Sequence, residues 1–177
     1  MYIFEPRYQE MLQYVLEHDR MMAVGTLMQG WDDESDEAVH PFSTAGLVRA
    51  SVAQADGTSQ LILQGVKRIE VLGWDQREPF PMARIQGVPT VDEFPPASMA
   101  LADELQELAG RLLPDNEEGR KIRAVLRGLR APDELADFVA ANFLPATEDR
   151  LELLGMSSLN ARLRFVRKAL LSSLKGV

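Results

Sequence analysis

The sequence predicts an α+β protein in which a strand-rich half precedes a helical half. Short apolar runs separated by turn signals fill the first half, and Asp56-Gly57 is a strong hairpin signal between two of them. After a Pro-Pro pair, apolar residues recur at three- and four-residue spacing to the end of the chain. Because strands followed by helices are typical of α+β proteins, we predict a β subdomain with one helix over residues 1–94 and a helical bundle over residues 95–177.

One helix and four strands are expected in the first half. Pro6 suits a first helical turn, because the N–H that it lacks would have no partner there anyway. Gly46 and Gly65 are expected at a bulge and at a bend where the side-chain alternation changes phase. Short strands with turns between them favour an antiparallel sheet or a small barrel. The helix is predicted over 6–18, and the strands over 21–28, 43–54, 59–74 and 80–91. The buried positions expected in the third strand are Leu61, Leu63, Val66, Ile69, Val71 and Trp74.

Five helices joined by short turns are expected in the second half. Pro95 and Pro96 are expected to stiffen a joint at 92–98 and to block strand pairing there. Thr147 is the expected N-cap of the fourth of these helices, because its hydroxyl can accept a bond from the first turn. The five helices are predicted over 99–113, 117–129, 132–144, 147–156 and 157–174.

The composition is that of a globular protein and excludes several kinds of chemistry. Of the 177 residues, 46% are hydrophobic and none is cysteine, so disulfides, thiolate nucleophiles and cysteine-bound zinc are excluded. No apolar run has the length of a membrane span and no signal peptide is recognisable, so we expect a cytoplasmic protein. The net charge of −8 arises in residues 1–97, with 7 basic and 15 acidic side chains, and it disfavours nucleic acid and anionic membranes as partners.

Three segments carry a family resemblance, and they occur in a fixed order. They are "FEPRY" ahead of the first helix, "LQGVKRIEVL" after the hairpin, and "PDELADFVAANFLPATEDRLELLGMSSLNARLRFVRKAL" near the end. Together they resemble the LON substrate-binding domain, the N-terminal domain of ATP-dependent Lon proteases, over nearly the whole chain. The resemblance implies a PUA-like β-barrel followed by an α-helical bundle. It also implies a role in recognising unfolded or exposed segments of protein substrates, with a separate ATP-dependent protease as a partner.

The start of the sequence departs from the family pattern. Members of the family usually begin with a strand of the "LPLFPL" kind that leads into "IFEPRY", whereas this sequence begins almost at that motif. We therefore expect either a start that lies upstream or a barrel that lacks one strand. A missing strand leaves an unpaired sheet edge, which is open to strand addition, and a homodimer is also among the expected partners.

No catalytic residue, metal ligand or cofactor is predicted. A phosphate-binding loop needs closely spaced glycines followed by Lys and Ser or Thr, and no such run exists. Ser172, Ser173 and Lys175 lie at an amphipathic C-terminus without signs of an oxyanion hole, so we interpret them as a solvated helix end. His18 is expected at a helix end, and His40 follows an acidic loop whose spacing does not match a calcium loop. The acidic residues of that loop are Asp32, Asp33, Glu34, Asp36 and Glu37.

Substrate-contacting residues are not assigned by the sequence, but several candidates can be weighed. Glu5 and Arg68 are either a ligand-contacting pair or a structural salt bridge or backbone bond that fastens the helix start to the barrel, and we favour the structural interpretation. Phe4 and Tyr8 are expected in the core, and Trp31 is expected in core packing rather than on a binding surface. The early methionines either form an adaptable surface or fill the core, and we favour the core; they are Met11, Met21, Met22 and Met28.

The sequence therefore predicts a non-enzymatic domain that binds exposed segments of other polypeptides. The alternative is a PUA-like module that binds RNA or a small molecule. Basic stretches at 120–130 and 162–168 would suit RNA, but basic and acidic side chains balance over residues 98–177. A peptidase is the third hypothesis, and it is disfavoured because the resemblance stops before the ATPase and Ser-Lys peptidase modules of Lon proteases.

Overall fold

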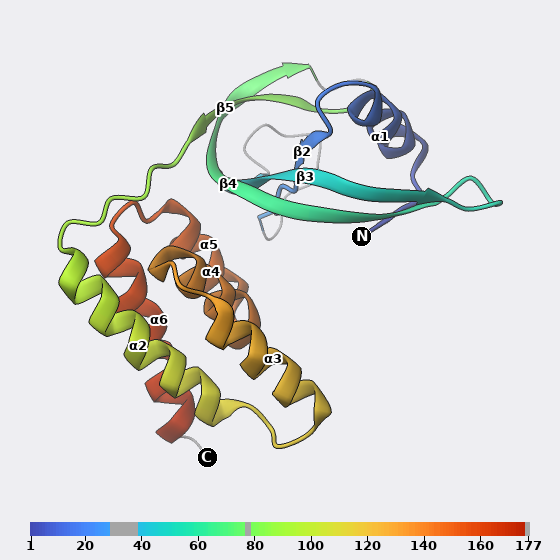
Figure 1. Cartoon of the computed structure of the whole chain (residues 1–177). Helices are drawn as coiled ribbons and strands as arrows, with labels where there is room; N and C mark the ends of the chain where they lie inside the picture. The colour runs from blue at the N-terminus through green and yellow to red at the C-terminus, as the bar shows by residue number, and fades with distance from the viewer. Residues whose placement is uncertain (29–38, 77–78, 176–177) are drawn as a thin grey trace. The chain divides into compact units, whose positions relative to one another are not determined.

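The computed structural model describes residues 1–28, 39–76 and 79–175. The chain forms two compact units, Met1–Val88 and Pro89–Val177 (Figure 1). Among the described residues, the first unit contains the sheet and one helix, and the elements of the second are helices. The predicted α+β order, strands before helices, is therefore confirmed.

The helix described in the first unit is α1 (Pro6–Glu17), within one residue of its predicted range. Pro6 occupies the first turn, where its missing N–H removes no helical hydrogen bond. Leu12 and Val15 are buried, because the apolar face of the helix packs on the sheet. The buried partners of these two residues are Ile3, Val48 and Leu61, with Tyr8, Met11, Leu16, Met22 and Leu63 half-buried around them.

The sheet is antiparallel throughout, with the order β1-β4-β3-β2 and with β5 also paired to β4. Its strands are β1 (Tyr2–Ile3), β2 (Met21–Ala23), β3 (Phe42–Ala53), β4 (Ser59–Gln76) and β5 (Met82–Gly87). No strand of the described ranges joins β2 to β5, so the sheet stays open, whereas the family resemblance implied a closed barrel. Closure requires every strand edge to be paired, and β2 and β5 each have a partner on one edge only among the described strands.

The hairpin between β3 and β4 forms where Asp56-Gly57 predicted it. Gly57 has φ of 86°, a left-handed conformation that glycine adopts without steric cost. The Asp56 carboxylate accepts bonds from the backbone N–H of Thr58 at 3.0 Å and from its hydroxyl at 2.6 Å. These bonds lower the pKa of Asp56 and hold the turn.

A bulge in β4 confirms the predicted change of phase beside Gly65. Ala45 pairs with Lys67 while Gly46 pairs with Gly65, so Val66 is an extra residue without a partner in the register. Val66 is 47% exposed, and its predicted burial is wrong, because the extra residue turns away from the regular alternation. Of the other expected core positions, Leu61 and Ile69 are buried, and Leu63, Val71 and Trp74 are half-buried.

The second unit contains the five predicted helices with small shifts at their ends. They are α2 (Pro95–Leu112), α3 (Glu117–Gly128), α4 (Pro132–Phe143), α5 (Thr147–Gly155) and α6 (Leu159–Lys175). The Pro-Pro pair begins α2 instead of forming a linker, because proline is well suited to a first helical turn. Thr147 is the first residue of α5 and Ala146 is its N-cap, so the predicted Thr147 cap is wrong.

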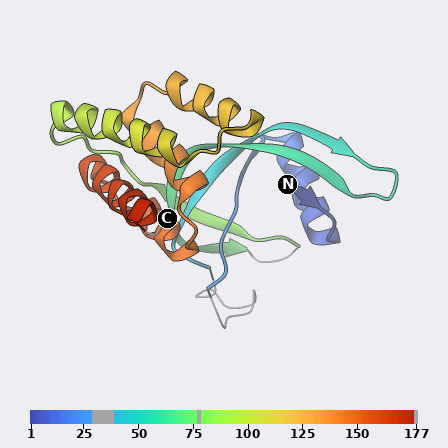
Figure 2. The ribbon, with the colours of Figure 1, turned by 90° about the horizontal axis from the view of Figure 1, so that it is seen from below.

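The core of this unit lies between α2, α4 and α6. Leu105 of α2, Val139 of α4 and Leu163 of α6 are each fully buried. Figure 2 shows α2, in yellow-green, and α6, in red, side by side. Apolar residues at helical spacing on each of the three helices produce this core, as the periodicity predicted.

The chain ahead of α2 is fastened to the start of α6. The Val91 N–H donates to the Ser157 carbonyl and the Leu159 N–H donates to the Val91 carbonyl, each at 2.9 Å. The Ser98 hydroxyl donates to Asp92 at 2.6 Å, and the Asn160 amide donates to the Ser98 hydroxyl at 3.0 Å. This connecting segment therefore belongs to the helical unit.

Candidate polypeptide-binding surface

Four large apolar side chains lie exposed on one face of the sheet in the first unit. Tyr2 pairs with Gln60 on β4, and Gln60 pairs with Val52 on β3, so these three residues form a row across three strands. Ile62 lies two residues beyond Gln60 and therefore points to the same face. Phe4 stacks on Tyr2 with ring centroids 6.0 Å apart. We call Tyr2, Phe4, Val52 and Ile62 the outer patch.

The opposite face of the same strands is the core that packs against α1. Ile3 and Leu61 alternate with residues of the outer patch, and a register shift between Val48 and Ala50 places Val48 on the same face as these two; all three are buried. Because successive side chains of a strand point to opposite faces, filling the core with Ile3 and Leu61 directs their neighbours outward.

The outer patch is more exposed than apolar side chains in a folded protein usually are. Exposed fractions are 50% for Tyr2, 59% for Phe4, 59% for Val52 and 65% for Ile62. Single exposed apolar residues are normal, and Val125 on α3 is an example at 48%. Several exposed apolar side chains on one face, here around the polar Gln60, make this face a candidate surface for binding another molecule.

The sequence did not identify this surface. It placed Phe4 in the core, and that prediction is wrong, because Ile3 takes the core position and its neighbour points away. Tyr8 does lie half-buried against the core, with the Arg7 guanidinium 4.7 Å above its ring. The signal that could have revealed the surface is the run Leu61-Ile62-Leu63, since three consecutive apolar residues in a strand put apolar side chains on both faces.

The other candidate residues lie apart from the outer patch or take structural roles. Glu5 forms its ion pair with Arg7 at 3.1 Å, and Arg68 is buried within β4. His18 ends α1 as expected, stacked on the Tyr14 ring with centroids 4.0 Å apart. Among the early methionines, Met11 and Met22 pack against the core and Met21 and Met28 are half-buried. Trp31 and the acidic loop lie outside the described residues.

The remaining polar candidates show local contacts. The His40 imidazole Nδ1 lies 3.2 Å from both the N–H and the carbonyl of Phe42. The hydroxyls of Ser172 and Ser173 donate to the carbonyls four residues earlier in α6. Within the residues that the structure describes, no group of three or more His, Asp or Glu side chains could hold a metal ion.

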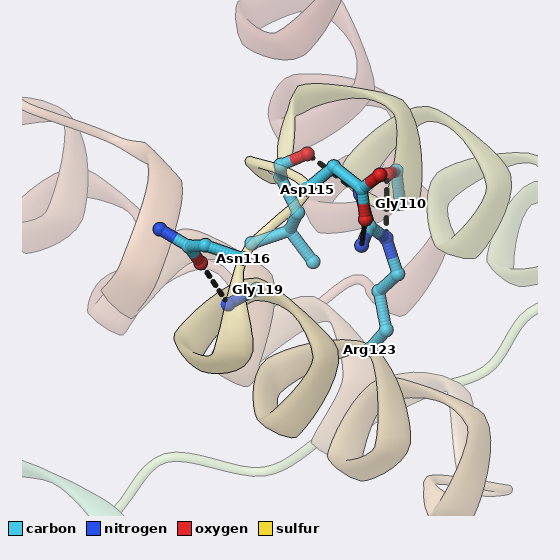
Figure 3. Close-up of polar contacts among 6 residues, drawn as sticks. Gly110, Asp115, Asn116, Gly119 and Arg123 are labelled. Carbon is cyan, nitrogen blue, oxygen red and sulfur yellow. Dashed lines mark hydrogen bonds and ion pairs between the residues drawn. The ribbon is translucent and has the colours of Figure 1, made fainter.

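One cleft of about 350 Å³ lies between α2 and α3 in the helical unit. Its walls carry both signs of charge; the lining residues are Asp103, Gln106, Glu107, Gly110, Arg111, Arg123, Leu126 and Arg127. The Arg123 guanidinium donates to the Leu113 carbonyl at 2.7 Å. It also donates to the Gly110 carbonyl at 3.4 Å and lies 3.9 Å from the Asp115 carboxylate (Figure 3). Small-molecule pockets are mostly apolar, so this cleft does not favour the small-molecule alternative.

The chain has the fold of Lon N-terminal domains, as two solved structures show. The N-terminal domain of the Mycobacterium avium complex Lon protease matches with a TM-score of 0.73 at 15% identity, over 96% of this chain and 89% of that one. A Lon N-terminal domain protein from Xanthomonas campestris matches with a TM-score of 0.68 at 18% identity, over 95% of this chain and 86% of that one.

The family itself is established by the match of a family model to residues 1–172. That model is described as the ATP-dependent protease La (LON) substrate-binding domain, and the chain belongs to this family. The resemblance found in the sequence is therefore confirmed. The matched domain is the non-catalytic, substrate-binding part of these proteases.

Full-length relatives are much longer than this chain. The Lon protease of Phenylobacterium zucineum is 31% identical over 134 residues, which are 74% of this chain and 17% of that protein. The Lon protease of Methylocella silvestris is 29% identical over 154 residues, which are 84% of this chain and 19% of that protein. The chain thus spans less than a fifth of the length of these relatives. None of the described helices is long and apolar enough to cross a membrane.

Proposed function

We propose that the chain binds exposed apolar segments of unfolded polypeptides at the outer patch of its first unit. The observation that carries this proposal is the outer patch, whose exposed apolar side chains lie around Gln60 on the face of the sheet that α1 does not cover. Membership of the LON substrate-binding domain family supports the same role. An unfolded polypeptide displays the apolar side chains that such a surface can remove from water.

The binding free energy would come mainly from burial of apolar area. Fully burying an Ile or Val side chain contributes about 1.5–3 kcal/mol of favourable free energy. Part of this gain offsets the entropy that the bound segment loses when it becomes ordered. A patch of four such side chains gives moderate affinity without a deep pocket. Because burial is not directional, the patch would accept many sequences, as a domain that recognises unfolded chains requires.

The test is a titration of fluorescein-labelled, reduced and denatured casein, followed by fluorescence anisotropy. Ile62→Thr combined with Val52→Thr removes apolar surface and keeps β-branched residues that suit a strand. Loss of about 1 kcal/mol for each side chain predicts affinity weaker by on the order of tenfold or more. Val125→Thr on α3 is the matched control, because it is exposed to a similar degree and lies outside the outer patch.

Two results would contradict this proposal. The first is that the unmodified chain binds no denatured casein at all. The second is that the strand variant and the Val125→Thr control bind equally well. A circular dichroism spectrum of each variant would establish that the fold is intact.

We also propose that substrates held in this way are delivered to an ATP-dependent protease. Support comes from the relatives, which are Lon proteases in which the matching region is 14–19% of the chain. Affinity purification from the native organism should then recover an ATP-dependent protease together with the chain. Recovery of client polypeptides without any protease would argue for a role in binding alone.

A further inference from the structure

The cleft between α2 and α3 has walls of opposite charge. Asp103 and Glu107 line it from α2, and Arg123 and Arg127 line it from α3. The two residues of each wall are four positions apart, so they lie on one face of their helix, about 6 Å apart along its axis. The volume of about 350 Å³ falls within the range of about 300–1,000 Å³ that is typical of ligand sites. We call the space between these four residues the charged cleft.

Two hydrogen bonds join the walls of the charged cleft and fix the distance between them. The Gln106 side-chain amide of α2 donates to the Leu126 carbonyl of α3. The Arg123 Nε of α3 donates to the Gly110 carbonyl of α2 at 3.4 Å (Figure 3). Leu126 is only 1% exposed and belongs to the core of the helical unit. The charged cleft is therefore preformed on rigid elements.

The charges on the two walls are not neutralised by other parts of the described chain. The side chains of Asp103, Glu107 and Arg127 are exposed and form no ion pair or hydrogen bond with another described residue. Arg123 donates to main-chain carbonyls, and its nearest carboxylate is that of Asp115, which is 3.9 Å away and 93% exposed. Opposite charges that face each other across a cleft without pairing are complementary to a molecule that carries both signs.

We propose that the charged cleft binds an extended segment of another protein in which basic and acidic residues alternate. Successive side chains of an extended chain point to opposite sides, and those on one side recur about every 6.6 Å, close to the spacing along each wall. Two basic residues then face Asp103 and Glu107 on α2. The acidic residues between them face Arg123 and Arg127 on α3. This inference goes beyond the proposed function, because it concerns the helical unit and a charged partner.

The alternation itself can be tested with two peptides of equal composition. The full chain would be titrated at low salt into a labelled, capped peptide Thr-Lys-Glu-Lys-Glu-Thr, followed by fluorescence anisotropy. The comparison peptide Thr-Lys-Lys-Glu-Glu-Thr places one residue of each sign on each side, so each wall meets one like charge. We expect the comparison peptide to bind at least threefold more weakly, and the affinity of the alternating peptide to fall as salt rises.

A steric block tests the place of binding. Gly110 lines the charged cleft, and a Cβ added to it would have no neighbouring group within 4 Å. Gly110→Leu therefore fills the cleft without changing any charge, and leucine suits a helix better than glycine does. We expect this variant to bind the alternating peptide at least fivefold more weakly. Gly128→Leu on α3 is the matched control: its Cβ also enters open space, Gly128 does not line the cleft, and binding should stay within about twofold.

A charge reversal tests which residues the peptide contacts. Glu107→Lys should weaken the alternating peptide at least threefold, because one of its lysines then meets a like charge. Of the two peptides in which a single lysine is replaced by glutamate, one should bind this variant within about twofold of the natural pair. The other loses its contact with Asp103 and should show no such recovery. Glu152→Lys on α5 is the control, because Glu152 is exposed and does not line the cleft.

The outcomes decide this inference separately from the proposed function, which the casein titration tests at the outer patch. Equal binding of the two peptides, binding of neither, or equal binding by Gly110→Leu and Gly128→Leu would overturn the inference. Failure of both single-lysine replacements to recover binding to Glu107→Lys would do the same. A dimer of the unliganded chain that Glu107→Lys dissociates, measured by analytical ultracentrifugation, would identify a second copy as the occupant and would also overturn it.

Discussion

Replacing Asp137 by alanine is expected to destabilise the helical unit far more than replacing its partner Arg162 by methionine. Arg162 of α6 is 1% exposed, and its Nη1 lies 2.8 Å from the Asp137 carboxylate of α4. The guanidinium also donates to the Thr90 hydroxyl at 3.5 Å, and its Nε has no hydrogen-bond partner among the described atoms. The Asp137→Ala variant therefore leaves a buried cation with little compensation.

The expected cost follows from the burial of the two partners. Breaking a fully buried ion pair costs roughly 3–5 kcal/mol, because one charge stays buried and unpaired. The Asp137 side chain is 55% exposed, so water reaches this pair and we reduce the estimate to about 2 kcal/mol. Arg162→Met removes the buried charge and keeps a long apolar side chain, so it should cost less than about 1 kcal/mol, and the double variant should behave like Arg162→Met alone.

Urea unfolding can measure this asymmetry for each unit separately. Both tryptophans lie in residues 1–88, whereas five of the six described helices lie in the second unit. Ellipticity at 222 nm therefore reports mainly on the helical unit, and tryptophan fluorescence reports on the sheet unit. A loss of 2 kcal/mol should lower the midpoint of the ellipticity transition by on the order of 1 M urea. Equal midpoints for the two single variants, or a loss below about 0.5 kcal/mol for Asp137→Ala, would refute the reasoning.

Four further expectations concern single features. Asn116→Ala should cost about 1 kcal/mol by urea unfolding, because its side chain caps α3 with a 2.8 Å bond from the Gly119 N–H (Figure 3). Gly119→Ala should cost more than the Asn116 change, because a Cβ there would overlap the Pro114 carbonyl oxygen. Arg167 lowers the pKa of Glu104 across a 2.7 Å ion pair. The pair therefore stabilises the fold at pH values above the usual pKa of a glutamate. This contribution is lost as the pH falls from about 5 toward 3 and Glu104 becomes protonated. The thermal unfolding midpoint of Glu104→Gln should therefore fall less over that pH interval than the midpoint of the natural chain. RNA should give no gel shift at low salt, because residues 1–88 carry an excess of acidic side chains.

The family and the order of elements could be predicted from the sequence because both are local properties. Pro6 and the apolar spacing after it specify α1, Asp56-Gly57 specifies the hairpin, and the helical period specifies α2 to α6. The wrongly predicted start of α2 has a local cause as well. Pro95 and Pro96 suit both a stiff linker and a first helical turn, and the packing of α2 decides for the helix.

The candidate site was not predicted, because exposure depends on pairing across the chain. Nothing near Phe4 in the sequence indicates that Ile3 takes the core position, and Ile62 differs from Leu61 only by one step of the strand alternation. Val66 was placed in the core by the same alternation, and a bulge against Ala45 and Gly46 put it at the surface. A one-residue change of register exchanges the two faces of a strand, so small errors in pairing invert predicted burial.

The sequence by itself determined that this protein is an α+β member of the LON substrate-binding domain family, with a strand-rich half ahead of five helices. The spacing of apolar residues, the turn residues and the family motifs can be recognised from residues that are close together in the sequence. Recognising them needs no knowledge of the fold. Only the tertiary structure decided that the described strands form an open sheet and that four apolar side chains lie together on its outer face. These properties arise from contacts between residues far apart in the chain, and such contacts leave no periodic signal in the sequence.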